Sequence, residues 1–135
     1  MEDTKFEIKK TQVLNNFRYE GRLTSGLDNV CICKVNVYVP DNSWSISGWY
    51  TADGYKSKGY GKITLSDTLK ALYKEHGKPN RIEYVWNGSN DYVYDWMTKH
   101  FNAKQKSPSI GPEDDWESHI YVLDVDKVLN YFGVH

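Results

Sequence analysis

Glycines and lysines gather in one short stretch, residues 54–62, which reads Gly-Tyr-Lys-Ser-Lys-Gly-Tyr-Gly-Lys. A β-favouring run, 44–51, precedes it, and apolar residues follow it at helical spacing at Leu65, Leu69 and Leu72. The order strand, glycine-rich turn, helix brings free backbone N–H groups to the positive end of a helix dipole. Such an arrangement suits a bound anion, and a phosphate or pyrophosphate above all.

Two interpretations of this stretch are open. Glycines between a strand and a helix are commonly plain turn formers, and lysines beside them are commonly solvated. A short glycine motif alone does not decide in favour of a phosphate site. The segment 56–61, Lys-Ser-Lys-Gly-Tyr-Gly, resembles the acyl-coenzyme A loop of the GNAT-family N-acyltransferases. That loop has Arg or Gln, two residues, Gly, one residue, and Gly or Ala; Lys56 keeps the charge of Arg without its planar fork.

Hydrophobic periodicity predicts the elements that must position this loop. Alternating apolar residues predict strands over 5–10, 29–39, 44–51 and 81–86, and apolar stripes predict helices from the loop to residue 76 and from residue 89 or 90 to 101. The segment 11–28 is ambiguous. Val13, Leu14 and Phe17 fit one turn of a short helix, but Gly21 and Gly26 interrupt the pattern.

The predicted helix after the loop also predicts how the strands on either side of it are arranged. A strand, a helix and a second strand imply that 44–51 and 81–86 are parallel neighbours joined by a right-handed crossover. Ligands in such sheets bind beyond the carboxyl ends of the strands, and the lysine-glycine turn lies at that end. We therefore expect one domain, 1–135, in which an antiparallel sheet is followed by a crossover unit.

The second half of the chain extends the resemblance. GNAT proteins carry a strand, an Asn, a helix with a small or apolar residue three positions on, and an end near Gly-Phe; the similar residues here are Trp86, Asn90, Val93 and Phe101. The likeness covers roughly 44–101, and 102–105 with 119–125 resemble the family's closing hairpin. It implies an α+β fold: a mixed, mostly antiparallel sheet with a splayed parallel strand pair and flanking helices. The N-terminal part does not match, because the family usually has two helices there.

The resemblance also implies a reaction, the transfer of an acyl group from acyl-coenzyme A, with acetyl-CoA as cosubstrate, to an amine acceptor without a metal. Main-chain amides of 58–62 would hold the pyrophosphate, and the backbone of 50–51 would pair with the pantetheine amides. The coenzyme-binding residues implied in this way are Tyr50, Thr51, Lys56, Ser57, Lys58, Gly59, Tyr60, Gly61, Lys62, Asn90 and Trp96.

The catalytic residues are not assigned. The transfer needs a base for the ammonium proton and an acid for the leaving thiolate. The family often uses a Tyr on the second helix as the acid, but the matching position here is Met97 or Trp96, depending on the alignment, and neither donates a useful proton. Glu83 and Asp53 are candidate bases, although each is also explained as a solvated surface carboxylate.

Composition excludes several other classes of protein. Hydrophobic residues make up 39% of the chain and aromatic residues 15%, which indicates a folded globule. A formal charge of -1 gives no overall field toward nucleic acid or membrane, and no apolar run is long enough to span a bilayer. Cys31 and Cys33 share one face of a predicted strand and are expected to be small core residues. They are poorly placed to bridge each other and have no His/Cys partners at metal-ligand spacing. We expect a cytoplasmic protein without a signal peptide.

Two functions from different classes stay open. The first is an acyl-CoA-dependent N-acyltransferase, and the second is a catalytically reduced protein on the same scaffold that binds CoA or a macromolecular partner without turnover. A third function, disfavoured by the net charge, is the binding of single-stranded nucleic acid by Lys56, Lys58, Lys62 and the tyrosines. Gly61→Glu is predicted to abolish coenzyme binding and leave the fold largely intact. The acceptor and the oligomeric state, a homodimer included, are undetermined.

Overall fold

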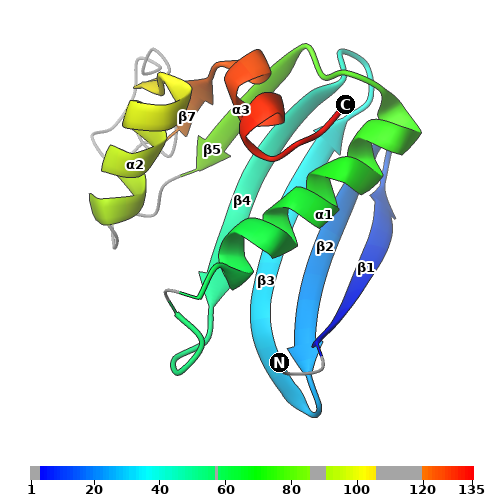
Figure 1. Ribbon diagram of the computed structural model, residues 1–135. Helices are drawn as coiled ribbons and strands as arrows, with labels where there is room; N and C mark the ends of the chain where they lie inside the picture. The colour runs from blue at the N-terminus through cyan, green and yellow to red at the C-terminus, as the bar shows by residue number, and fades with distance from the viewer. Residues whose placement is uncertain (1–3, 57, 86–90, 106–119) are drawn as a thin grey trace, which may run out of the picture.

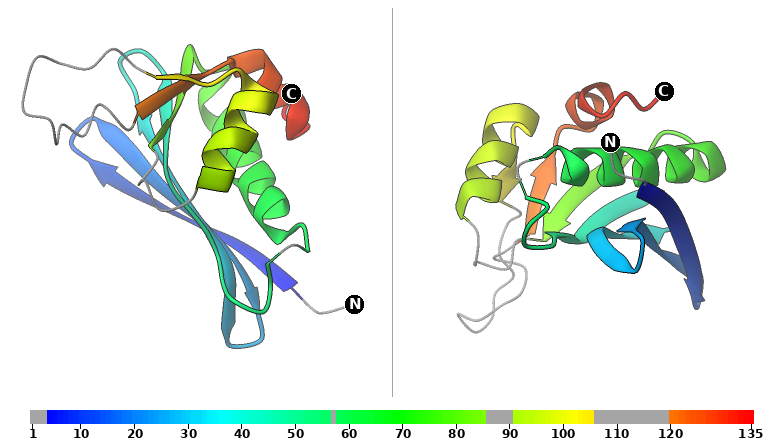
Figure 2. Two further views of the ribbon diagram at one scale, coloured as in Figure 1. Left: turned by 90° about the vertical axis from the view of Figure 1, so that its left-hand side faces the viewer. Right: turned by 60° about the horizontal axis from the view of Figure 1, so that its bottom comes forward.

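The computed structural model describes residues 4–56, 58–85, 91–105 and 120–135, which form a single mixed sheet with helices on one face (Figures 1 and 2). The described strands are β1 Thr4–Val13, β2 Asn16–Ser25, β3 Asp28–Tyr38, β4 Ser43–Thr51, β5 Arg81–Val85, β6 Lys104–Gln105 and β7 Ile120–Leu123, in the sheet order β1-β2-β3-β4-β5-β7-β6. The helices are α1 Tyr60–His76, α2 Asp91–Phe101 and α3 Val125–Tyr131.

The N-terminal segment forms a long antiparallel hairpin, so the short helix considered for 11–28 is wrong. β1 and β2 pair from Thr4↔Ser25 to Val13↔Asn16. In β2, Tyr19, Gly21 and Leu23 are buried under α1, while the residues between them are more exposed, which is the period of a strand. Of the two glycines that obscured this alternation, Gly21 lies inside the strand, whereas Gly26, with φ 61°, lies in the turn between β2 and β3.

The next strand, β3, is buried along the face predicted from sequence. Cys31, Cys33, Val35 and Val37 are all within 1% of complete burial, whereas Val39 lies past the end of the strand and is exposed. Both cysteines are free. The prediction that they are small core residues is therefore confirmed.

The predicted parallel pair is also confirmed, and it splits partway along. β4 and β5 pair in parallel from Ser43↔Arg81 to Ile46↔Tyr84, after which no β4–β5 pairing continues in the described residues. The β3–β4 register shifts at the same level, where Lys34↔Gly48 is followed by Val35↔Ile46, so Ser47 is an extra, bulged residue. A bulge bends its strand and increases its twist, which accounts for the separation of β4 from β5. We call the point after Ile46 and Tyr84 the fork.

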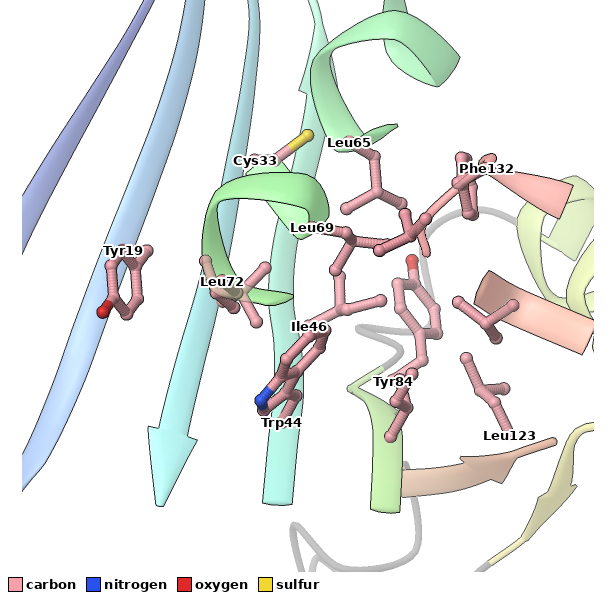
Figure 3. Close-up of a cluster of buried hydrophobic side chains, with 14 of the residues drawn as sticks. Tyr19, Cys33, Trp44, Ile46, Leu65, Leu69, Leu72, Tyr84, Leu123 and Phe132 are labelled. Carbon is pink, nitrogen blue, oxygen red and sulfur yellow. The ribbon is translucent and has the colours of Figure 1, made fainter. Parts of the chain in front are cut away.

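The hydrophobic core lies between the sheet and the helices. Figure 3 labels these of its members: Tyr19, Cys33, Trp44, Ile46, Leu65, Leu69, Leu72, Tyr84, Leu123 and Phe132. The three leucines of α1 repeat at helical spacing and are fully buried, as their pattern predicts. Each fully buried side chain of this size stabilises the fold by about 1.5–3 kcal/mol relative to exposure. The same leucines therefore fix α1, and with it the loop before it, against the sheet.

The C-terminal part closes the sheet and adds a helix. β6 and β7 pair antiparallel as the predicted closing hairpin. α3 was not predicted; Asp124 caps it by accepting a hydrogen bond from Lys127 N at 3.1 Å. α2 ends at Phe101 as expected, whereas its expected cap, Ser89 or Asn90, lies outside the described residues.

Candidate functional site

The start of α1 presents backbone amides that precede the hydrogen bonds of the helix. Gly59 is the N-cap residue, with φ 83°, and no side chain caps the helix. The first bond of the helix runs from Ile63 N–H to the Gly59 carbonyl at 3.1 Å, so the amides of Gly61 and Lys62 come before the intrahelical ladder. The first turn carries no acidic side chain. These features, together with the helix dipole, make this helix start suitable for an anion.

Gly61 holds the helix start against the end of β4. Its carbonyl accepts a hydrogen bond from Trp49 Nε1 at 3.0 Å. A Cβ at this position would lie 3.3 Å from Trp49 Nε1 and 3.4 Å from Thr51 Oγ1, so a side chain would require these neighbours to shift by a few tenths of an ångström. Gly61→Glu therefore crowds this contact as well as adding a negative charge, and its expected effect on coenzyme binding stays a prediction.

Beyond the fork, one edge of β4 is open along the described residues. Gly48, Trp49, Tyr50 and Thr51 pair with β3 on one side and have no strand partner on the other. Tyr50 is 60% exposed. The five residue-to-residue steps from Ile46 to Thr51 span about 17 Å, and Thr51 lies beside Gly61. An open strand edge thus runs from the fork to the amides of α1.

Lysines surround the helix start, and each has a different environment. Lys56 forms an exposed ion pair with Asp53 at 3.2 Å, and Lys58 is exposed. The Lys62 ammonium lies 4.4 Å from the centre of the Tyr131 ring, which joins the start of α1 to the C-terminal helix. Tyr60 stacks edge-on against Tyr55, with ring centres 6.0 Å apart. Ser57 lies outside the described residues, as does Asn90.

An aromatic cluster joins β4 to α2 and α3. Trp96 has its ring centre 5.6 Å from that of Trp49, 5.2 Å from His100 and 5.3 Å from Tyr131. Phe101 and Phe132 complete the cluster. Trp96 thus lies against Trp49 in the part of β4 beyond the fork, and its role as a coenzyme contact stays a prediction. Tyr131 and Phe132 were missed because α3 was not predicted, although Asp124 before an apolar run is a helix-start signal.

The fork also carries two titratable side chains on opposite faces of β5. Glu83 pairs in register with Ser45 and forms an ion pair with Arg81 at 3.2 Å; its side chain is 13% exposed. Tyr84 stands on the helix side and points toward α1 and Phe132 (Figure 3). Burial raises the pKa of Tyr84, so its phenol keeps its proton at neutral pH. Sequence reasoning identified Glu83 but missed Tyr84, because its alternating neighbours indicate a core residue.

The other acid–base candidates do not reach the fork. Asp53 lies in the loop, is 91% exposed and is engaged by Lys56. Met97 is buried in the core and Trp96 lies in the aromatic cluster, so neither supplies a proton. Within the described parts of the chain, no three His, Cys, Asp or Glu side chains are grouped to hold a metal.

A pair of thiols lies beneath the loop. The Thr51 hydroxyl donates to Cys31 Sγ at 3.6 Å. A hydrogen bond from Cys33 holds the pKa of Cys31 below its usual value against the opposing effect of burial, whereas burial raises the pKa of Cys33. Because both sulfurs are inaccessible to solvent, they contribute packing and not a reactive group.

No family model matches this chain, and no curated protein matches it. Solved structures do. A GNAT-family acetyltransferase from Staphylococcus aureus has a TM-score of 0.57 at 13% identity, over 82% of this chain and 68% of that one. A Bacillus subtilis acetyltransferase in complex with CoA has a TM-score of 0.51 at 13% identity, over 89% and 99%.

A ribosomal-protein-alanine N-acetyltransferase from Escherichia coli has a TM-score of 0.53 at 13% identity, over 84% of this chain and 72% of that one. The mostly antiparallel sheet of this chain, with its one parallel pair and its helices, is consistent with the fold of these structures. The chain therefore has the GNAT fold. In the described residues, no helix is long and apolar enough to cross a membrane.

Proposed function

We propose that the protein is an acyl-CoA-dependent N-acyltransferase that uses acetyl-CoA and acts on an amine acceptor. The observation that carries this proposal is the continuity of the open β4 edge with the amides at the start of α1, beside the fork. The pyrophosphate of coenzyme A would bind the amides at the start of α1. The pantetheine arm that follows it, with its two amides, would pair with the open β4 edge. The solved acetyltransferase that contains CoA supports this assignment by its similar fold.

The dimensions support the same assignment. The pantetheine arm has about as many backbone bonds as four to five residues of extended chain. This equals the separation between Thr51, beside the helix start, and Ile46, at the fork. With the pyrophosphate on the amides of 58–62 and the arm along 47–51, the thioester would lie at the fork. Trp49 and Trp96 would then line the arm.

The side chains at the fork suggest how the reaction proceeds. The amine nitrogen attacks the thioester carbonyl carbon, a C–N bond forms, and the C–S bond breaks to release CoA. Glu83 is the candidate to take the ammonium proton, and Tyr84 the candidate to protonate the thiolate. Because they lie on opposite faces of β5, the amine would approach from the face without helices while the coenzyme lies on the helix side.

A second function has an observation in its favour. Trp96 and Met97 stand where the family often has its tyrosine acid, and a β-hairpin stands where the family has two helices that shape the acceptor site. Both differences fit a protein that binds CoA or a macromolecular partner without turnover.

Thiol release from acetyl-CoA with a panel of primary amines separates the two functions. An enzyme releases CoA, and Tyr84→Phe lowers kcat by roughly 100-fold or more while acetyl-CoA affinity stays constant. Tyr73→Phe, on α1 and away from the fork, is the matched control and retains activity. Coenzyme binding without amine-dependent thiol release would support the second function and refute the first.

A further inference from the structure

The first strand has a free edge. β1 is the terminal strand of the sheet and pairs with β2 on one side; among the described residues no strand pairs with its other side. Nine of its ten residues are exposed, and Phe6 is half-buried. α1 packs mainly over β2 and β3, and only its C-terminal end reaches the C-terminal end of β1, so most of this edge is left uncovered (Figure 1). A ten-residue unpaired edge is a template for another strand.

The hairpin turn determines which backbone groups are available at this edge. Val13 and Asn16 flank a two-residue turn and therefore form a hydrogen-bonded pair. Hydrogen-bonded and non-bonded pairs alternate along an antiparallel ladder, so the odd-numbered residues of β1 bond to β2. The amides and carbonyls that point outward belong to the even-numbered residues, Thr4, Phe6, Ile8, Lys10 and Gln12.

We propose that β1 pairs antiparallel with β1 of a second copy of this chain, about a two-fold axis at Ile8. Ile8 then faces Ile8 of the second copy, Phe6 faces Lys10, and Thr4 faces Gln12. All of these are outward-bonding residues, so the register forms about ten backbone hydrogen bonds. Ile8 is 38% exposed in the single chain and becomes the centre of the contact.

Charge selects this register over its neighbours. With the axis at Ile8, Glu7 lies opposite Lys9 of the second copy, and this pair occurs twice because of the two-fold symmetry. An axis at Glu7 would place the two Glu7 carboxylates opposite each other, and an axis at Lys9 would do the same with two ammonium groups. An axis at Phe6 pairs Lys5 with Glu7 but leaves much of the strand without a partner.

Lysines on an edge strand also serve in many proteins to prevent pairing. Here, the Lys10 ammonium is directed away from the edge, because it binds Glu75 and lies 4.3 Å from the centre of the Phe17 ring. Lys5 is paired with Glu7 at 3.2 Å within its own strand. The strand contains no proline and, by its register with β2, no bulge. The charges are thus arranged as complementary pairs and not as a uniform repulsive row.

Charge reversal in the full chain tests this dimer. Sedimentation velocity at tens of micromolar should show a dimer for the unmodified protein. Glu7→Lys and Lys9→Glu should each raise the dimer dissociation constant at least tenfold, because each places two like-charged pairs across the axis. An equimolar mixture of the two variants should recover the dimer, because every cross-axis pair is again opposite in charge.

Lys5→Glu is the matched control, because position 5 faces Thr11 of the second copy; this variant should remain a dimer. Circular dichroism checks that each variant is folded. A monomeric unmodified protein, single variants that dimerise as well as the parent, or folded monomeric variants whose mixture stays monomeric would each overturn the inference. These results are independent of coenzyme binding.

Discussion

Gly21 lies where α1 comes closest to β2. A Cβ at this position would stand 1.9 Å from Thr68 Oγ1 and 3.1 Å from Thr68 Cβ, closer than packed atoms approach. Thr68 is fully buried and its hydroxyl donates to the Thr64 carbonyl at 2.7 Å, so it has little room to move. Glycine at position 21 is therefore needed for the close approach of helix and strand.

Gly21→Ala should lower the free energy of unfolding by roughly 2 kcal/mol, because the added methyl group overpacks this contact. Urea denaturation measures the loss. Gly48→Ala is the control, since its Cβ would meet Lys34 atoms no closer than 3.4 Å. In a Thr68→Ala background the cost of Gly21→Ala should shrink; an equal cost in both backgrounds would show that the contact is not responsible.

Glu75 joins the end of α1 to the N-terminal hairpin. Its carboxylate accepts hydrogen bonds from Lys10 and, at 2.8 Å, from the Tyr19 hydroxyl. The bond from Lys10 is the main reason that the pKa of Glu75 is below its usual value. A carboxylate with a depressed pKa stabilises the fold above its unfolded pKa and loses that contribution as the pH falls through its folded value.

Glu75→Gln should therefore destabilise the protein by roughly 1 kcal/mol at pH 7, since the group is largely exposed and its ion pair is screened. The difference in unfolding free energy between the two proteins should narrow as the pH falls below about 4. Thermal unfolding from pH 7 to pH 3 measures it. A difference that is constant over this range would contradict the assigned role of the carboxylate.

The elements differ in how well their sequences predict them. The loop, α1 and the β4–β5 pair depend on local signals, namely Gly59 and Gly61, the leucine spacing, and a strand on either side of a helix; all were predicted. The β1–β2 hairpin was not, because Gly21 removes the apolar residue that would complete the alternation of Tyr19 and Leu23. Position 21 requires glycine because of its contact with Thr68. These two residues are far apart in the sequence, so the contact cannot be inferred before the fold is known.

The turn of this hairpin carries a local conflict. Leu14 has φ 56°, the left-handed region, and is 87% exposed. A leucine there pays the steric cost of that conformation and gains no burial. Hairpin turns of two residues favour glycine at such a position.

Leu14→Gly should raise the free energy of unfolding by roughly 0.5–1 kcal/mol, the balance of the relieved strain and the greater freedom of glycine in the unfolded chain. The midpoint of thermal unfolding reports the change. Leu27→Gly is the control, because Leu27 is also fully exposed in a hairpin turn but has an ordinary φ. If both substitutions had the same effect, strain at Leu14 would not be its cause.

At the scale of the whole molecule, the contacts that build the hydrophobic core also position the candidate site. The leucines of α1 fix the helix, Gly61 and Trp49 fix its start on β4, and Ser47 opens the fork. Periodicity predicted α1 and the parallel pair of strands around it, and the family resemblance implied that the pair is splayed. The aromatic cluster was not predicted, because its contacts with Tyr131 depend on α3, which was not predicted. The candidate role of Tyr84 was not predicted, because its alternating pattern indicates only a core residue.

Calorimetric titration with acetyl-CoA tests the central claim, that the amides before α1 bind a diphosphate. Lys58→Glu places a negative charge on an exposed loop residue, and Lys70→Glu places the same charge on an exposed position farther along α1. We predict saturable binding by the unmodified protein, at least tenfold weaker binding by Lys58→Glu, and unchanged binding by Lys70→Glu. Absence of binding by the unmodified protein, or equal affinity in all three proteins, would contradict the account.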